Sequence, residues 1–165
     1  MSIEDVKTLC VTNFPTSRSR PAIMEGLEKA LRLLHDHNIS AEVWLDGSFM
    51  TKKIDPADVD IVVAIHRDAF DGGTEVIKSV ILHFDNSDYL KTLYCDAYVL
   101  FMLPDTADPI LREAGEINRK YWIQKFGTSR GSDEKGNKLN HYVDKGLALV
   151  KTPFNGGSLD GGLNE

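Results

Sequence analysis

The chain has 165 residues, of which 42% are hydrophobic and 27% are charged, a composition typical of one globular domain rather than of a disordered, collagen-like or coiled-coil chain. Its 19 Lys and Arg against 25 Asp and Glu give a net charge of -6, which argues against extensive nucleic-acid binding. The N-terminus lacks a signal-peptide pattern, and no apolar run approaches the ~20 residues of a membrane span. We therefore expect a cytoplasmic protein without a membrane anchor.

The first half of the chain predicts a loop, a helix and two strands. Two prolines and three hydroxyl residues predict a loop over Phe14–Pro21. Apolar residues spaced three and four apart predict an amphipathic helix over Ala22–Asp36. A short apolar run predicts a strand over Ala41–Leu45, and the nearly continuous apolar run over Val59–Ile65 is typical of a central strand covered on both faces.

The second half predicts further helices and strands of one domain. In chain order these are a helix over Thr74–Phe84, a short helical piece at Tyr89–Leu93, a strand over Cys95–Leu103, a long helix over Pro109–Phe126, a loop over Thr128–Lys138 and an edge strand over Lys145–Val150. We expect a single α/β (α+β) domain over residues 1–153, with a small mixed sheet flanked by helices, and a flexible tail over 154–165. Cys10 and Cys95 stand in apolar surroundings, which is typical of buried free thiols.

Acidic residues cluster where two of the predicted strands begin. Asp58 and Asp60 are two residues apart at the start of a strand, so their side chains should point to one face of the sheet. Such a pair repels strongly unless a hard cation such as Mg²⁺ or Mn²⁺ lies between the carboxylates. Asp96 opens the next strand and supplies a third carboxylate, with Asp85 and Asp88 as weaker candidates. Three carboxylates at one sheet end can hold two metal ions roughly 4 Å apart.

Gly47 and Ser48 follow the first predicted strand at a strand-to-helix turn. Backbone N–H groups and the Ser48 hydroxyl can bind phosphate oxygens there, and Gly47 permits close approach. We therefore expect the phosphate and metal sites to be neighbours. Four basic residues are candidates for contacts with a triphosphate, although such side chains are more often only solvated: Arg18, Arg20, Lys52 and Lys53.

The stretch Val43–Val63 combines an apolar strand, Gly-Ser, a short polar gap and Asp-x-Asp heading a second apolar strand. This pattern resembles the DNA polymerase β-like nucleotidyltransferase superfamily, in a minimal single-domain form found in bacteria and phages. The resemblance implies the nucleotidyltransferase fold. It also implies that Asp58, Asp60 and Asp96 bind the metal ions and act in catalysis, and that Gly47-Ser48 holds the β- and γ-phosphates of a nucleotide such as ATP.

The same resemblance implies transfer of a nucleoside monophosphate from an NTP to an acceptor, with release of pyrophosphate. Larger relatives append a helical domain that holds the base and the acceptor, whereas only about sixty residues follow Leu103 here. The acceptor is therefore open: a protein, a small molecule or a nucleic-acid end, of which the last fits the acidic composition least. The alternative is a non-catalytic module of the same fold, such as an antitoxin-like regulatory partner.

Overall fold

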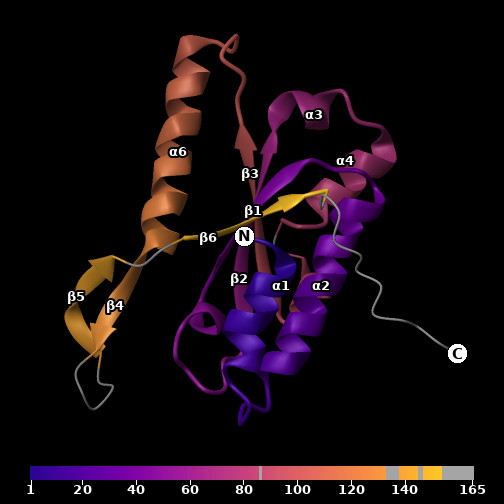
Figure 1. The fold of residues 1–165 in the computed structure, drawn as a ribbon. Coiled ribbons are helices and arrows are strands. Elements are labelled where there is room, and N and C mark those ends of the chain that lie inside the picture. Colours follow the sequence, from indigo (N-terminus) through magenta and orange to yellow (C-terminus); the bar gives the residue numbers. More distant parts are fainter. Residues whose placement is uncertain (86, 133–137, 145–146, 154–165) are drawn as a thin grey trace, which may run out of the picture.

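The computed structural model describes residues 1–85, 87–132, 138–144 and 147–153, and its centre is a four-stranded sheet (Figure 1). The strands lie in the order β3-β2-β1-β6, and their bounds are β1 Ala41–Asp46, β2 Val59–His66, β3 Cys95–Met102 and β6 Ala148–Thr152. β1 pairs antiparallel with β2 and β6, whereas β2 and β3 are parallel. This confirms the expected α+β domain with a small mixed sheet and a central apolar strand.

One face of the sheet carries the larger part of the hydrophobic core. Val43, Leu45, Ile61 and Val63 alternate along β1 and β2 and are buried on this face, as the period of two in a strand requires. The helical segments packed against them are α1 Ile3–Lys7, the π-helical turn η1 Thr8–Thr12, α2 Arg20–Asp36, α4 Glu75–Leu82 and α5 Asp88–Thr92. Both cysteines are buried free thiols, as expected.

The opposite face of the sheet is covered by α6, Pro109–Gly127, which Figure 1 shows on the other side of the strands from α1 and α2. Its last turns pack Trp122 and Phe126 against a smaller core that includes Trp44 and Val62. The outward side of α6 remains exposed, with Ile110 at 77% of its full accessibility. Lys125, in the last turns of α6, lies near Asp60 of β2 and Tyr98 of β3 on this face.

Three segments differ from the sequence-based expectation. The predicted loop over Thr128–Lys138 is wrong at both ends, because β4 Thr128–Ser132 pairs antiparallel with β5 Lys138–Asp144, while residues 133–137 lie outside the described residues. A ribbon held by backbone hydrogen bonds outside the main sheet needs no apolar alternation, so the sequence carries little signal for it. The edge strand is confirmed next to β1, although it runs to Thr152, and Lys145 and Gly146 lie outside the described residues, as does the predicted tail.

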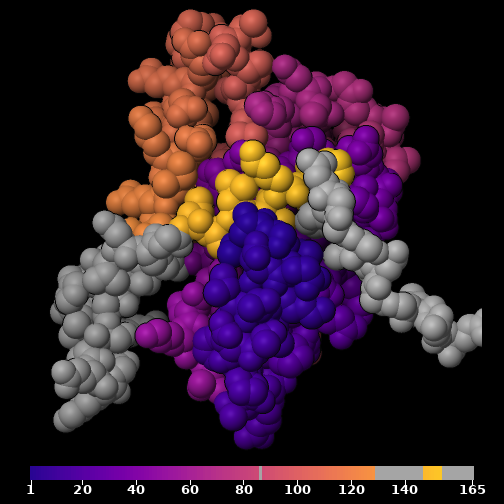
Figure 2. All heavy atoms as spheres, viewed as in Figure 1, coloured from indigo at the N-terminus to yellow at the C-terminus, as the bar shows by residue number. Residues whose placement is uncertain are grey.

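The N-terminal segment was also without a predicted structure. Helix α1 begins with a capping box in which Ser2 and Asp5 exchange hydrogen bonds, and the Met1 ammonium donates to the carbonyl of Leu149 at 2.8 Å. Figure 2 shows this segment lying against β6. A short helix, α3 Arg67–Asp71, follows β2 directly and was likewise not predicted. None of the described helices is long and apolar enough to cross a membrane.

Candidate functional site

Three aspartates form a row across three neighbouring strands. Asp46 at the end of β1 is paired with Asp60 in β2, and Asp60 is paired in turn with Asp96 in β3. Residues in register on adjacent strands point to the same face, so the three carboxylates project on the α6 side of the sheet. Asp46 is only 8% exposed. The row is a direct consequence of the strand register and places three acidic groups at one end of the sheet.

Asp58 adds a fourth carboxylate to this group. It is exposed, immediately precedes β2 and lies two residues before Asp60. Burial, followed by the charges of Asp58, Asp46 and Asp96, raises the pKa of Asp60 to about 6, and the ammonium of Lys125 opposes the rise. The charges of Asp58 and Asp96, two of the three predicted metal ligands, therefore act on the third, the partly buried Asp60. We call Asp46, Asp58, Asp60 and Asp96 the carboxylate cluster.

Gly47 closes one side of the carboxylate cluster through a turn that only glycine can form. Its φ angle is +80°, in the region that L side chains rarely adopt, and a Cβ at this position would collide with Oδ2 of Asp60. Ser48 follows and begins the 3-10 helix η2, Ser48–Met50. The predicted strand-to-helix turn is therefore confirmed, and it lies against the central aspartate of the row.

Arg20 was a candidate for phosphate contact, and the structure contradicts this. Its side chain is fully buried, with the guanidinium 3.7 Å above the centroid of the Phe14 ring. All three guanidinium nitrogens donate to backbone carbonyls, at 2.6–3.2 Å, and the acceptors are Cys10, Phe49, Thr51, Lys53 and Ile54. Arg20 therefore fixes the loop that connects Ser48 to Asp58 and has no donor left for a ligand.

The other basic candidates lie on the surface of that loop region. Lys52 and Lys53 are exposed, and Lys53 contributes the carbonyl that Arg20 binds. Arg18 is exposed and its backbone N–H donates to Asp55, which also accepts from the hydroxyl of Ser17. Binding of phosphates by Arg18, Lys52 or Lys53 stays a prediction.

Of the three candidates for the third carboxylate, Asp96 alone lies in a strand beside Asp60. Asp96 lies in register with Asp60, whereas Asp85 and Asp88 are exposed outside the strands, and Asp88 forms an ion pair with Lys91. Tyr98 Oη donates to Oδ2 of Asp96 at 3.0 Å, and this hydrogen bond raises the pKa of Tyr98. Asp96 is thereby held on the α6 side of the sheet, next to the cluster.

Three residues of the site were not singled out by the sequence. Asp46 could have been found from the sequence, because it lies two residues after Trp44, on the same face of the strand, and directly precedes the glycine turn. Tyr98 shares a face with Asp96 in the same way. Lys125 carries no such signal: its ammonium lies 4.6 Å from the Trp122 ring centroid and 5.2 Å from that of Tyr98, and this depends on how α6 docks on the sheet.

A cavity of about 290 Å³ adjoins the cluster where β2 and β3 begin. Asp58 and Asp96 line it together with Lys91, Tyr94 and Cys95. Two carboxylates, one ammonium and one exposed aromatic ring thus face the same space. The cavity is large enough for part of a nucleotide or an acceptor group beside the carboxylates.

The donor set of the cluster fits a hard divalent cation. Among the described residues, no three His, Cys, Asp or Glu side chains are arranged so that they could hold a metal ion. The chemistry is nevertheless that of Mg²⁺ or Mn²⁺ sites, which take carboxylate oxygens. Burial first, and then the charges of the three neighbouring aspartates, raise the pKa of Asp60 by more than the Lys125 ammonium lowers it. Asp58, Asp60 and Asp96 are the residues that would hold such an ion.

Asp60→Asn is expected to stabilise the metal-free protein by about 1 kcal/mol at pH 7, because it removes a carboxylate that burial and three neighbouring charges disfavour. The folded pKa of about 6 lies above the ordinary 3.8, so the contribution of Asp60 to stability is present below pH 4 and is lost as pH rises through 6. Urea unfolding in EDTA should therefore give a higher free energy of unfolding for the variant than for wild type at pH 7, and equal values near pH 4.

The matched control is Asp85→Asn, which removes an exposed carboxylate outside the strands and should leave stability unchanged at both pH values. A marked loss of stability in the metal-free Asp60→Asn variant at pH 7 would mean that this aspartate serves the fold rather than a ligand.

A model described as a family of unknown function (DUF6932) matches residues 1–148 of the chain. The match includes the whole carboxylate cluster and the Gly47-Ser48 turn. No curated protein and no solved structure matches the chain.

Proposed function

We propose that this chain, which belongs to the family of unknown function DUF6932, is a metal-dependent nucleotidyltransferase of the DNA polymerase β-like type. An acceptor oxygen attacks the α-phosphorus of an NTP, the bond to the bridging oxygen of the β-phosphate breaks, and pyrophosphate leaves. The observation that supports this best is the row of Asp46, Asp60 and Asp96 in strand register beside the glycine turn at Gly47.

In this proposal, the position of each residue determines whether it binds phosphate or metal. Gly47 and Ser48 lie at the turn next to Asp60 and hold the β- and γ-phosphates through backbone N–H groups and the Ser48 hydroxyl. Asp58 and Asp60, two residues apart at the start of β2, hold the metal ions together with Asp96. A bound Mg²⁺ or Mn²⁺ neutralises phosphate charge and makes the acceptor hydroxyl more acidic.

In this proposal Asp96 takes the proton of the acceptor. Its Oδ2 accepts a hydrogen bond from Tyr98, which leaves Oδ1 as the oxygen that can receive a proton. It also lines the cavity of about 290 Å³, so an acceptor bound there meets this carboxylate. Tyr98 is a positioning residue, because it acts through Asp96 and not on the substrate.

The second candidate function is a non-catalytic module of the same fold that recognises a partner protein. The observation that favours it is that no three of the described His, Cys, Asp and Glu side chains form a group that could hold a metal ion. Such a module has no use for a nucleotide, so nucleotide binding separates the two functions.

The experiment is thermal unfolding of the full chain with each NTP, in Mg²⁺, in Mn²⁺ and in EDTA. Mg²⁺–NTP at a hundredfold excess over its Kd is expected to stabilise the fold by about 2.7 kcal/mol, several degrees in Tm. Asp96→Asn is expected to keep part of this shift, because Asp58 and Asp60 remain, while losing transfer. An unchanged Tm with every NTP at millimolar concentration in both metals would contradict the enzyme and favour the partner-binding module.

A further inference from the structure

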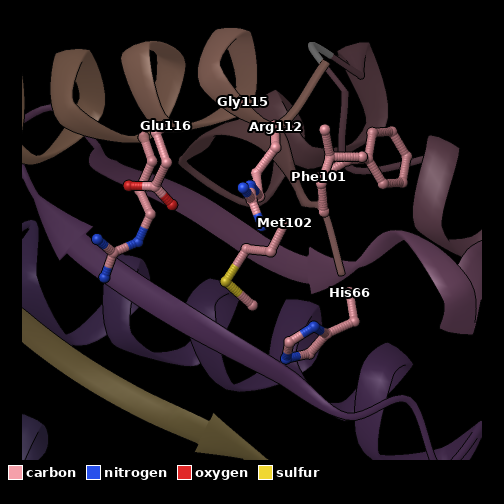
Figure 3. Close-up of a pocket in the computed structure, with 8 residues that line it drawn as sticks. His66, Phe101, Met102, Arg112, Gly115 and Glu116 are labelled. Atoms are coloured by element: carbon pink, nitrogen blue, oxygen red, sulfur yellow. The ribbon is translucent and has the colours of Figure 1, made fainter. Parts of the chain in front are cut away.

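A second cavity, of about 190 Å³, lies between α6 and the far ends of β2 and β3 (Figure 3). Its lining includes His66, the last residue of β2, and Met102, the last residue of β3. Asp60 and Asp96 stand at the opposite ends of the same strands, six residues earlier, which corresponds to about 20 Å. The cavity is therefore separate from the carboxylate cluster.

Positive charge predominates in the lining of this cavity. Arg112 and Arg119 of α6 line the cavity, and Glu116 supplies the one carboxylate among the residues that line it. Figure 3 shows the side chains of Arg112 and Glu116 extending from α6 toward the strands, with Met102 and His66 at the strand ends below them. In a chain of net charge -6, two guanidinium groups around one small cavity form a locally cationic site.

The two arginines differ in what already binds them. Arg112 donates through Nη1 to the backbone carbonyl of Asp105 at 3.0 Å, which fixes its guanidinium at the rim. Arg119 is half-buried, and within the part of the chain that the structure describes it has no ion pair and no hydrogen bond. An anion in the cavity would supply the charged acceptor that the Arg119 guanidinium lacks.

The remaining wall is apolar. Met102 and Leu103 line it from the end of β3, and Gly115 lies opposite on α6. A Cβ at Gly115 would stand 3.2 Å from Cδ1 of Leu103, which is closer than ordinary van der Waals contact, so the glycine allows the Leu103 side chain to pack closely against α6. The wall can cover an apolar group of a ligand whose anionic end meets the guanidinium groups.

We propose that this cavity binds a small organic anion, with a phosphate or carboxylate group on a compact apolar body of roughly ten non-hydrogen atoms in all. Guanidinium groups bind either acid through paired N–H donors. The location agrees with the general rule that ligands of α/β sheets bind outside the carboxyl ends of parallel strands, and β2 and β3 are a parallel pair. This site is independent of the nucleotidyltransferase proposal.

The test is a titration of the ¹⁵N-labelled full chain, followed by NMR, with phenyl phosphate, benzoate, inorganic phosphate and phenol. We expect phenyl phosphate or benzoate to shift amides around Met102, Leu103 and Gly115, and to bind at least about tenfold tighter than phenol or inorganic phosphate. Arg119→Gln should weaken the organic anion at least about tenfold. Lys120→Gln removes the same charge from an exposed neighbour on α6 that does not line the cavity, and should leave the affinity unchanged.

Gly115→Leu provides a second, charge-neutral variant. The Leu103 side chain has to shift by a few tenths of an ångström to admit the new Cβ, and the better helix propensity of leucine offsets this cost, so the variant should fold, fill the cavity and lose the ligand. Equal weakening by Arg119→Gln and Lys120→Gln would overturn the proposal, because it would indicate general attraction of anions. Full binding by Gly115→Leu, or no binding of either organic anion to wild type at millimolar concentration, would overturn it as well. None of these readouts involves nucleotide or metal, so failure here is distinct from failure of the proposed enzyme.

Discussion

Replacing Asp58 or Asp60 by asparagine is expected to reduce transfer of the nucleoside monophosphate by at least about 10³-fold. Both residues belong to the carboxylate cluster, and Asp60 lies against the turn that would hold the phosphates. Asparagine keeps the shape of the side chain but removes the charge that binds a divalent cation. Initial rates of label transfer from an α-labelled NTP, at saturating Mg²⁺, measure the loss.

Asp71→Asn is the matched control for these variants. Asp71 ends α3, which follows the far end of β2, and its carboxylate pairs with Arg67 at the surface. Its loss should leave the transfer rate unchanged and cost at most a few tenths of a kcal/mol in stability. Substantial transfer by both Asp58→Asn and Asp60→Asn would show that the carboxylate cluster does not take part in catalysis.

Arg20→Met is expected to lower the free energy of unfolding by about 3 kcal/mol or more. The guanidinium is fully buried and makes six hydrogen bonds to the carbonyls of five residues. Methionine fills a similar volume but leaves these acceptors without their donors. The bonds join η1, η2 and the loop before Asp58, so the loss should also loosen the turn that follows Gly47. Urea unfolding, monitored by circular dichroism, measures the change.

Arg18→Met removes the same charge two residues away from an exposed side chain and should change stability by no more than about 0.5 kcal/mol. Arg20→Lys should fall between wild type and Arg20→Met, because an ammonium retains the charge but has only three donors. If Arg20→Met unfolds with the same free energy as Arg18→Met, the guanidinium does not organise the loop.

The sequence was informative where a side-chain pattern repeats and where turn chemistry is specific. The spacing of apolar residues predicted α2 and α6, and the apolar runs predicted β1, β2 and β3, each to within a few residues. The glycine turn and the convergence of Asp58 and Asp60 followed from residue type and from the period of two in a strand.

The remaining features depend on tertiary contacts that a single sequence does not encode locally. Asp46 joins the row only because β1 and β2 pair antiparallel in that register. Lys125 reaches Tyr98 only through the docking of α6. Arg20 was interpreted as a surface cation because arginines are mostly exposed, and its burial results from three segments that converge on it.

The most direct test of nucleotidyl transfer compares one NTP labelled at the α-phosphate with the same NTP labelled at the γ-phosphate, incubated with the full chain, Mg²⁺ and a cell lysate as the source of acceptors. A nucleotidyltransferase should move the α-label to an acceptor, release the γ-label as pyrophosphate and lose both with Asp60→Asn. Transfer of the γ-label to an acceptor, or no transfer of the α-label with any NTP, would contradict the proposed function.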